Sequence, residues 1–261
     1  MPNNISRNIN ESAGKTWVET WDVLVVGSGF AGLAAAIEAR AAGCSVLVLE
    51  KMLGWGGNST ICDGGLAAPD TDMQRERGIQ DSPEQMAADM LAAGLGLNQP
   101  ALVRSVAENA KEVFEWTRNT LKVRYMDRVD RFGGHSVDRC YTTHNKSGSA
   151  IVRALLDKAL ELGVTLRNRT RLERLLTNAE GRVRGVEVRK GYRFPNEGSG
   201  SAMRIGVRRA VVLAAGGFAG DVPFRSAQDP RLDASVDATT KRSATAEALR
   251  EALRIGALPA H

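Results

Sequence analysis

The sequence predicts an α/β fold of the Rossmann type, in which helices cover a parallel sheet that carries an inserted β-hairpin or meander. Three observations favour this fold. Residues 23–26 are all apolar and predict a strand buried on both faces, because no polar residue alternates with them. A glycine-rich turn and an alanine-rich helix over residues 33–42, closed by Gly43, follow at once. A second apolar strand at residues 46–49 completes a strand–helix–strand unit.

The turn between the first strand and the helix has the pattern G-x-G-x-x-G. It reads Gly27-Ser28-Gly29-Phe30-Ala31-Gly32. In this pattern the first glycine makes the tight turn, the second lets the backbone approach a pyrophosphate, and the third lets helix and strand pack closely. Backbone N–H groups at the start of the helix, together with the helix dipole, favour a phosphate there. A purely structural turn is the alternative, since glycine-rich turns are common.

An acid at the end of the second strand strengthens the prediction. Glu50 follows residues 46–49 and lies about 20 residues beyond the glycines, the spacing typical of a dinucleotide fingerprint. Its carboxylate can accept hydrogen bonds from both ribose hydroxyls of an adenosine and would repel a 2′-phosphate. The sequence therefore predicts a dinucleotide site, with NAD and FAD both open at this point.

Composition and charge fit an ordinary globular protein. The chain has 261 residues, 43% of them hydrophobic and 25% charged. Its net charge of +5 is spread along the chain and aromatic residues make up only 5%, which argues against a nucleic-acid surface and for a solvated basic face that attracts anionic ligands. No apolar run reaches the roughly 18 residues that a membrane span needs, so no span is predicted.

Neither cysteine nor histidine spacing predicts a metal site. Cys44, Cys62 and Cys140 form no C-x-x-C pair, and the three histidines are dispersed. The cysteines fit free thiols in a reducing compartment. Residues 1–20 are polar and are interpreted as a flexible arm without the apolar stretch of a signal peptide, ahead of a domain over residues 21–261. The expected compartment is therefore the cytoplasm, and the periplasm is the alternative if a leader has been removed.

The chain between Glu50 and residue 125 is predicted as a glycine-studded loop followed by two helices. Residues 51–72 hold five glycines and suggest backbone wrapped closely round something flat or charged, with a plain surface loop as the alternative. One helix begins at Ser82, with Pro83 at its first position and Gln85 completing a capping box. The other begins at Pro100, and its spacing predicts these inward residues: Leu102, Val103, Val106, Ala110, Val113 and Phe114.

The rest of the chain is predicted as loop, helix and strands in turn. Residues 125–149 are interpreted as loop, 149–162 as a helix, 164–166 as a short strand and 171–188 as a hairpin turning at 178–181. A polar connection over 191–201 precedes a buried strand at 208–213, and a last helix covers 245–255. Four polar residues of the loop are candidate substrate contacts, although a structural role is favoured for each: Arg139, Tyr141, Thr143 and His144.

Glycine motifs beyond Glu50 separate FAD from NAD. An NAD-binding domain would continue into another helix and parallel strand. Here Glu50-Lys51 is followed by Gly56-Gly57-Asn58-Ser59, by Asp63-Gly64-Gly65-Leu66 and, much later, by Ala214-Ala215-Gly216-Gly217-Phe218. This ordered set resembles the fumarate reductase and succinate dehydrogenase flavoprotein superfamily, above all the soluble fumarate reductases called flavocytochromes c. The resemblance runs from about residue 21 to residue 256. It implies an FAD-binding domain of the glutathione-reductase type that holds FAD without a covalent bond.

The resemblance also implies roles for individual residues, all of them small side chains or backbone groups. The pyrophosphate would lie at the glycine turn and Ala31, the adenosine ribose at Glu50, and the adenine at the backbone of Leu172. The remaining cofactor contacts that it implies are Gly27, Gly29, Phe30, Gly32, Lys51, Gly57, Asn58, Ser59, Gly64, Gly65, Ala215 and Gly216. Family members carry Gly-Asp-Gly where this chain has Ala246-Glu247-Ala248, which is a departure from the pattern.

By resemblance, the expected activity is hydride transfer between flavin N5 and a carbon–carbon double bond next to a carboxylate. A dicarboxylate or another unsaturated acid would be the substrate. The family's catalytic residues belong to a capping domain that would follow residue 258, so no catalytic residue is assigned and the chain is expected to be truncated before that domain. One alternative is a split or non-catalytic flavoprotein that needs a partner chain. Others are a ketosteroid dehydrogenase-like flavoprotein and, less favoured, an NAD-linked dehydrogenase.

Overall fold

The structure is a computed structural model that describes residues 16–259; the first 15 residues of the predicted arm lie outside the described residues. The chain divides into two compact units. The first unit comprises Met1–Asn58 and Leu156–Leu258, and the second comprises Ser59–Leu155 and Pro259–His261. Each unit is described by itself. Along residues 16–259, no helix combines the length and apolar character that a membrane crossing requires.

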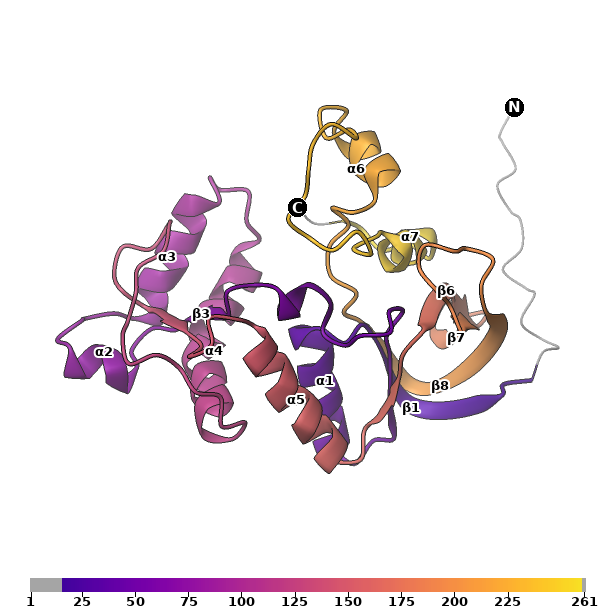
Figure 1. Ribbon diagram of the computed structural model, residues 1–261, viewed down its shortest axis with the longest axis horizontal. Coiled ribbons are helices and arrows are strands. Elements are labelled where there is room, and N and C mark those ends of the chain that lie inside the picture. The colour runs from indigo at the N-terminus through magenta and orange to yellow at the C-terminus, as the bar shows by residue number, and fades with distance from the viewer. Residues whose placement is uncertain (1–15, 260–261) are drawn as a thin grey trace. The chain divides into compact units, whose positions relative to one another are not determined.

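The first unit is built on a sheet of six strands in the order β5-β2-β1-β8-β7-β6. Figure 1 labels four of them, β1, β8, β7 and β6. The strands are β1 (Glu19–Val26), β2 (Val46–Leu49), β5 (Thr165–Arg167), β6 (Thr170–Thr177), β7 (Val183–Lys190) and β8 (Ser201–Leu213). Strands β5, β2, β1 and β8 run parallel to one another, whereas β8, β7 and β6 form an antiparallel meander. The predicted α/β fold with a parallel sheet and an inserted meander is confirmed.

The sequence patterns account for the centre of this sheet. The last four residues of β1 and all four of β2 are buried, as their unbroken apolar runs predict. Helix α1 (Phe30–Ala41) covers these strands and ends where Gly43 adopts φ +81°, a left-handed conformation that glycine reaches without strain. A single apolar core joins β1 and β2 to the inner face of the meander, where Leu172, Val186 and Ile205 lie.

Strand β8 is longer than predicted. It begins at Ser201, within the segment interpreted as a polar connection, and Lys190 of β7 pairs with Ser201. The basic residues obscured this stretch: Ile205, Gly206 and Val207 are buried where β8 pairs with β1 and β7, while Arg208 is exposed. Helix α6 (Val222–Gln228) was not predicted, and α7 (Glu247–Arg254) is slightly shorter than predicted. Strand β1 starts at Glu19, two residues before the expected start of the domain.

The second unit packs three helices against a two-stranded sheet. Helices α2 (Asp72–Glu76), α3 (Pro83–Ala93) and α4 (Pro100–Asn119) accompany β3 (Gly65–Ala67), which pairs antiparallel with β4 (Cys140–Thr142). Residues 125–149 therefore hold a strand where loop was predicted. Tyr141 of β4 is fully buried and stacks on Phe114 of α4, with ring centroids 4.2 Å apart. This ring pair anchors β4 in the core of the unit.

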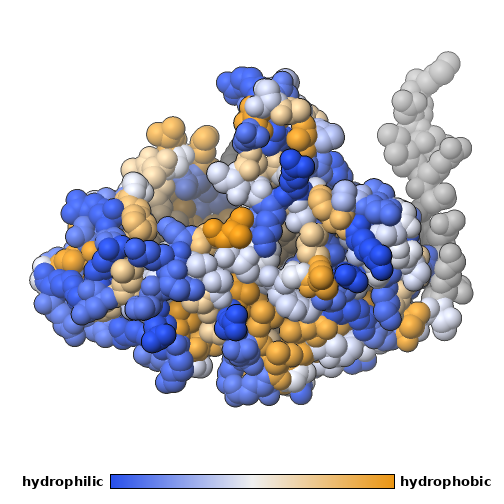
Figure 2. All heavy atoms as spheres, viewed as in Figure 1, coloured by the Kyte–Doolittle hydropathy of each residue, from blue (hydrophilic) through white to orange (hydrophobic). Residues whose placement is uncertain are grey.

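Helix α4 exposes part of the face that was predicted to point inward. Val103, Ala110 and Phe114 are buried, but three other predicted core residues are 63%, 52% and 45% exposed: Leu102, Val106 and Val113. The apolar stripe is wider than the surface that α3 and β3 cover in this unit. Figure 2 shows hydrophobic side chains gathered at the end of α3 as well, and the turn that follows this helix holds the exposed Leu95 and Leu97.

The helix starts differ in detail from the prediction. Ser82 caps α3, since its hydroxyl accepts a hydrogen bond from the backbone N–H of Gln85 at 3.2 Å. The return bond of the predicted capping box does not form, because the Gln85 side chain donates instead to Ser136 at 3.0 Å. A complete capping box occurs one helix earlier, between Thr71 and Gln74 at the start of α2.

Candidate cofactor site

The glycine turn lies where three parallel strands of the first unit end. The backbone N–H of Gly27 donates to Leu49 O of β2 at 2.8 Å, and that of Ala214, just after β8, donates to Val26 O of β1 at 2.8 Å. Gly27 has φ +104°, and a Cβ at this position would lie 2.3 Å from Ala214 O. Only glycine fits here. The turn is therefore closed by the chain segment that carries Ala215 and Gly216.

Gly32 brings α1 against the same turn. A Cβ on Gly32 would lie 2.0 Å from Gly27 O and 3.3 Å from the Cβ of Ala214. The close packing of helix and strand expected of the third glycine is thus required by the geometry. Gly29 is the N-cap of α1 and makes no side-chain capping bond, and the first turn, which holds Phe30 and Ala31, contains no acidic side chain. The positive end of the helix dipole meets no carboxylate of its own helix.

Glu50 is buried beside this turn and held in place by three hydrogen bonds. One carboxylate oxygen accepts from the Ser28 hydroxyl at 2.6 Å and from the Ser28 backbone N–H at 3.3 Å. The other accepts from the Met52 N–H at 2.9 Å. Ser28 is fully buried and its hydroxyl also accepts from the Gly56 N–H at 2.9 Å, so it ties the turn to the glycine loop. Ser28 was not predicted as a site residue, although it lies inside the glycine pattern.

The segment expected to meet the adenine lies beside Glu50. The N–H of Thr170 donates to Glu50 O at 2.9 Å, and that of Arg169 donates to Met52 O at 3.1 Å. Leu172 follows two residues later in β6, where its side chain enters the core and it pairs with Val188 of β7. The residues predicted for the ribose and for the adenine are therefore brought to neighbouring backbone segments.

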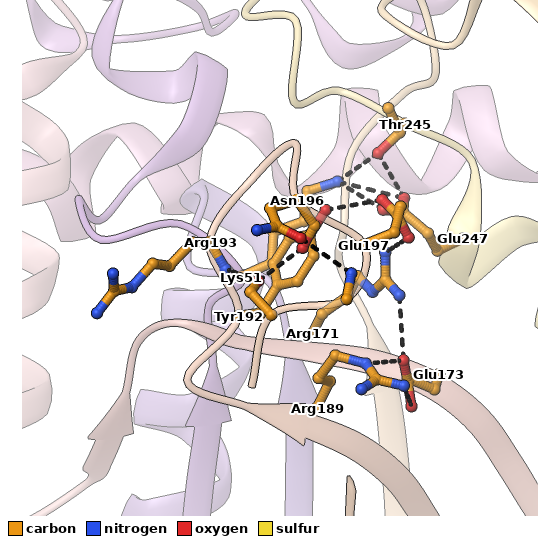
Figure 3. Close-up of polar contacts among 12 residues, drawn as sticks. Lys51, Arg171, Glu173, Arg189, Tyr192, Arg193, Asn196, Glu197, Thr245 and Glu247 are labelled. Atoms are coloured by element: carbon orange, nitrogen blue, oxygen red, sulfur yellow. Dashed lines mark hydrogen bonds and ion pairs between the residues drawn. The ribbon is translucent and has the colours of Figure 1, made fainter. Parts of the chain in front are cut away.

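Lys51 points toward helix α7. Its ammonium group donates to the Thr245 hydroxyl and to both carboxylate oxygens of Glu247, at 3.1 and 3.2 Å (Figure 3). The Thr245 hydroxyl also bonds to Glu247 at 2.6 Å. Glu247 occupies the centre of the Ala246-Glu247-Ala248 departure from the family pattern. In this structure its carboxylate serves the ion pair with Lys51.

The other predicted contacts are divided between the two units. Gly57, with φ +47°, and Asn58 close the first segment of the first unit, and the side-chain oxygen of Asn58 accepts from the Lys241 N–H at 2.9 Å. Ser59, Gly64 and Gly65 belong to the second unit. A 3₁₀ turn, η1 (Gly57–Thr60), spans the point of division.

Within the second unit, Gly64 is required by close packing. It has φ +73°, and a Cβ there would lie 2.4 Å from the Thr143 hydroxyl oxygen and 2.7 Å from the Ser147 carbonyl carbon. Gly65 opens β3, and its N–H donates to the Asp63 side chain at 2.9 Å. Packing inside the unit is thus sufficient to explain the glycine at position 64, whatever else its backbone contacts.

Arg139 and Tyr141, two of the candidate substrate contacts in the loop, are buried and have structural roles. Arg139 is wholly buried and binds Asp81 through two hydrogen bonds, at 2.7 and 2.9 Å, and Asp89 at 2.6 Å. Burial opposes the charge of Asp89, but hydrogen bonds from Ser136 and Arg139 outweigh it and hold the pKa of Asp89 below its usual value. The Tyr141 hydroxyl donates to the Ala68 carbonyl oxygen at 3.4 Å and shares a hydrogen bond with the Thr71 hydroxyl.

His144 differs, because it is exposed. It borders an open pocket of about 730 Å³ in the second unit that Asp72, Arg118 and Tyr125 also line. Arg118 holds Asp72 there through two hydrogen bonds, at 2.7 and 3.0 Å. Among residues 16–259, no three side chains of histidine, cysteine, aspartate or glutamate gather as metal ligands would.

The first unit offers the groups that FAD requires. A helix start without an acidic cap suits a pyrophosphate, and a buried carboxylate beside it suits ribose hydroxyls. The glycines at positions 27 and 32 could carry no side chain without collision, so the turn presents backbone only. The residues present therefore fit the cofactor.

Comparisons with known proteins also point to FAD. The profile of the family described as FAD binding domain matches residues 22–257. The acrylate reductase flavoprotein subunit of Shewanella woodyi is 44% identical over 98% of this chain and 50% of its own length. The urocanate reductase of Eggerthella lenta is 35% identical over 90% of this chain and 38% of its own. The chain thus spans half or less of the length of these curated relatives.

A solved structure shows the same fold. The open conformation of a flavocytochrome c3 fumarate reductase matches with a TM-score of 0.85 and 31% sequence identity, covering 93% of this chain and 41% of that one. The resemblance to fumarate reductase flavoproteins, which rested on the glycine motifs, is confirmed.

Proposed function

We propose that this chain, which belongs to the FAD-binding domain family, holds the cofactor of a flavoprotein reductase that acts on an unsaturated carboxylic acid. The cofactor is FAD. The observation that carries the proposal is the 44% identity, over nearly the whole chain, to the flavoprotein subunit of an acrylate reductase. Acrylate, urocanate and fumarate, which the relatives' names mention, are all carboxylates conjugated to a carbon–carbon double bond.

Each residue of the site has a binding or orienting role in this proposal. The first-turn amides of α1, at Phe30 and Ala31, bind the pyrophosphate, and Glu50 binds the adenosine ribose. The backbone of Leu172 meets the adenine. Ser28 orients the Glu50 carboxylate.

Toward the flavin half, the proposal assigns contacts that are mostly backbone groups. They are Gly57, Asn58, Ser59, Gly64, Gly65, Ala215 and Gly216. Bound FAD supplies hydride exchange at N5 of its ring, and the protein contributes position and charge stabilisation. We further propose that the cofactor is held without a covalent bond, so acid precipitation of the loaded protein should release all of its flavin.

We propose that the proton donor of the reaction comes from outside residues 16–259. Arg139 and Tyr141 are buried in the core of the second unit, where ion pairs and ring packing occupy them. A general acid must reach the substrate within hydrogen-bond distance. A partner chain or further polypeptide would supply it. The three free cysteines among the described residues favour the cytoplasm as the compartment.

The test separates cofactor binding from turnover. Purified chain is first titrated with FAD, followed by flavin fluorescence, and tight binding is expected. Reduced methyl viologen is then offered with acrylate, urocanate, fumarate and a 3-ketosteroid in parallel. Little or no turnover is expected from this chain alone, while a full-length protein containing it should reduce one of the acids. Reduction of the steroid alone would contradict the proposed substrate class.

A further inference from the structure

The loop between β7 and β8, residues 191–200, is longer than its position in the sheet requires. Neighbouring antiparallel strands can be joined by two residues. This loop is instead ordered by its own hydrogen bonds, since the Arg193 N–H donates to the Ser199 hydroxyl at 2.7 Å and that hydroxyl donates to Asn196 O at 2.6 Å. A Cβ on Gly200, which has φ +84°, would lie 2.5 Å from Lys190 O. The loop therefore has a defined conformation, and joining β7 to β8 does not by itself require a loop of this length.

The backbone of the loop is joined to both segments that meet the adenosine. Arg169 is the centre of the connection. Its N–H donates to Met52 O at 3.1 Å, and its carbonyl oxygen accepts from the N–H groups of Gly191 and Tyr192 at 2.8 and 2.9 Å. Arg169 adopts φ +46°, which costs a non-glycine residue energy. Three chain segments, following β2, preceding β6 and following β7, therefore meet at one residue.

The side chains of the loop hold Arg171, the residue before Leu172. The Arg171 guanidinium lies 4.4 Å from the centre of the Tyr192 ring, and it pairs with Glu197 of the loop and with Glu173 (Figure 3). The Tyr192 hydroxyl donates to Glu197 at 3.0 Å. Burial raises the pKa of Tyr192 to about 12, and the bond to Glu197 adds to this effect, so the hydroxyl remains a donor at neutral pH.

A second contact reaches Lys51, the residue after Glu50. Its ammonium lies 6.0 Å from the centre of the Phe194 ring, at the limit for a cation–π contact. The Glu197 pKa is lowered chiefly by the hydrogen bond from Arg171, and the charge of Lys51 contributes to the same shift. The loop thus touches the neighbours of both residues assigned to the adenosine, one on each side.

We propose that residues 191–200 form a clasp that positions Glu50 and the Leu172 backbone for the adenosine half of FAD, with Tyr192 and Glu197 as its positioning residues. This inference rests on the proposed assignment of Glu50 and Leu172. Neither positioning residue touches the cofactor in the proposal; each acts through Arg171. The clasp fixes the separation of the two backbone segments that carry Glu50 and Leu172.

The experiment measures the affinity of ADP, which carries the adenosine and pyrophosphate but no flavin. The chain and its variants Tyr192→Phe, Glu197→Gln and the double variant are titrated with ADP and with FAD by calorimetry, and thermal unfolding is recorded for each. The double variant removes the hydrogen bond from Tyr192 and weakens the one from Arg171, both of which end on the charged Glu197 carboxylate, so the ADP and FAD dissociation constants should both rise about tenfold. The matched control is Glu187→Gln, which removes an ion pair to Arg204 between β7 and β8.

The control decides between a clasp and a simple support for the meander. Weakened ADP binding in the double variant, with affinity unchanged in Glu187→Gln, supports the clasp. Unchanged ADP affinity in the double variant overturns it, as does an equal loss in the control at a matched fall in unfolding temperature. If the double variant does not fold, the ADP affinity of Tyr192→Phe, which lacks a single oxygen, is compared with that of the control in the same way. A wild-type chain that binds neither FAD nor ADP would instead overturn the assignment of the site itself.

Discussion

Replacing Arg139 by methionine tests whether this arginine is structural or serves a ligand. The substitution keeps an unbranched apolar stem and removes the charged guanidinium. Arg139 and its partner Asp81 have fully buried side chains, and the side chain of Asp89 is 14% exposed. The change leaves two carboxylates facing an apolar group in the core of the second unit.

The size of the effect follows from what remains for each carboxylate. Removing one partner of a buried ion pair costs about 3–5 kcal/mol. Asp81 keeps hydrogen bonds from the Gln74 side chain at 2.8 Å and the Ser82 N–H at 2.9 Å. Asp89 keeps two from Ser136, both at 2.9 Å. Because both carboxylates keep these hydrogen bonds, the expected loss of stability is at the lower end of that range, about 3 kcal/mol.

Hydrogen exchange of peptides from α3 and α4 measures this loss within the second unit. The control is Arg131→Met, which breaks an exposed pair with Asp138, with side chains 56% and 38% exposed. That loss should stay below about 1 kcal/mol. ADP affinity is measured on both variants where they are folded and should not change. Equal destabilisation by the two variants would refute the structural role, as would a loss of ADP binding without a loss of stability.

Three further predictions concern the first unit and the effect of pH. Gly32→Ala places a methyl group 2.0 Å from Gly27 O, a backbone atom that no rotamer change can move, so urea unfolding should show a loss of about 1–3 kcal/mol together with weaker FAD binding. Gly133→Ala, where the added Cβ meets nothing within 4 Å, is its control and should change neither quantity. Glu50→Gln replaces a charged acceptor by a neutral amide and should weaken ADP binding by about 1.5–3 kcal/mol in calorimetry; unchanged affinity would remove Glu50 from the ribose. The pKa of Asp89 is lower in the folded protein than its unfolded value of about 3.9. Its contribution to stability is therefore present above about pH 3.9 and is lost as the pH falls through the folded-state pKa. Hydrogen exchange of α3 amides should accelerate in acid, and it should accelerate less in Asp89→Asn.

The sequence predicted the centre of the first unit because two local signals coincide there. The apolar runs predict two buried strands, β1 and β2, and the glycines between them predict a tight turn. The packing of the sheet agrees with both predictions. The start of β8 was missed because Met203, Ile205 and Val207 are separated by Arg204 and Gly206 and followed by two arginines, so the stretch looked basic rather than strand-forming. Periodicity within a helix does not say how much of its surface a neighbour covers, which is why the exposure of Leu102 and Val106 on α4 was not foreseen.

The candidate site was predictable where a residue type is demanded by backbone geometry. Gly27, Gly32 and Glu50 lie where the fingerprint places them. Tyr192 could not be found in this way, because its hydrogen bond reaches Glu197 through a side-chain direction that no spacing rule encodes. Ser28 lies inside the glycine pattern but was missed, because the pattern leaves the side chain at that position unspecified. The pairing of Lys51 with Glu247 is similar, since the two residues are distant in sequence and meet only after α7 is in place.

The closing of the Gly27 turn by Ala214 has a consequence for how the protein forms. The turn is made early in synthesis, yet its close partner comes from the far end of β8, after the whole meander. Pairings between such distant segments form slowly, because the chain entropy of a long loop must be lost before any contact rewards it. The nascent chain therefore carries an unclosed dinucleotide turn until β8 has emerged and inserted beside β1. Cofactor added during refolding should bind only after this late step, and its uptake then reports the completion of the sheet.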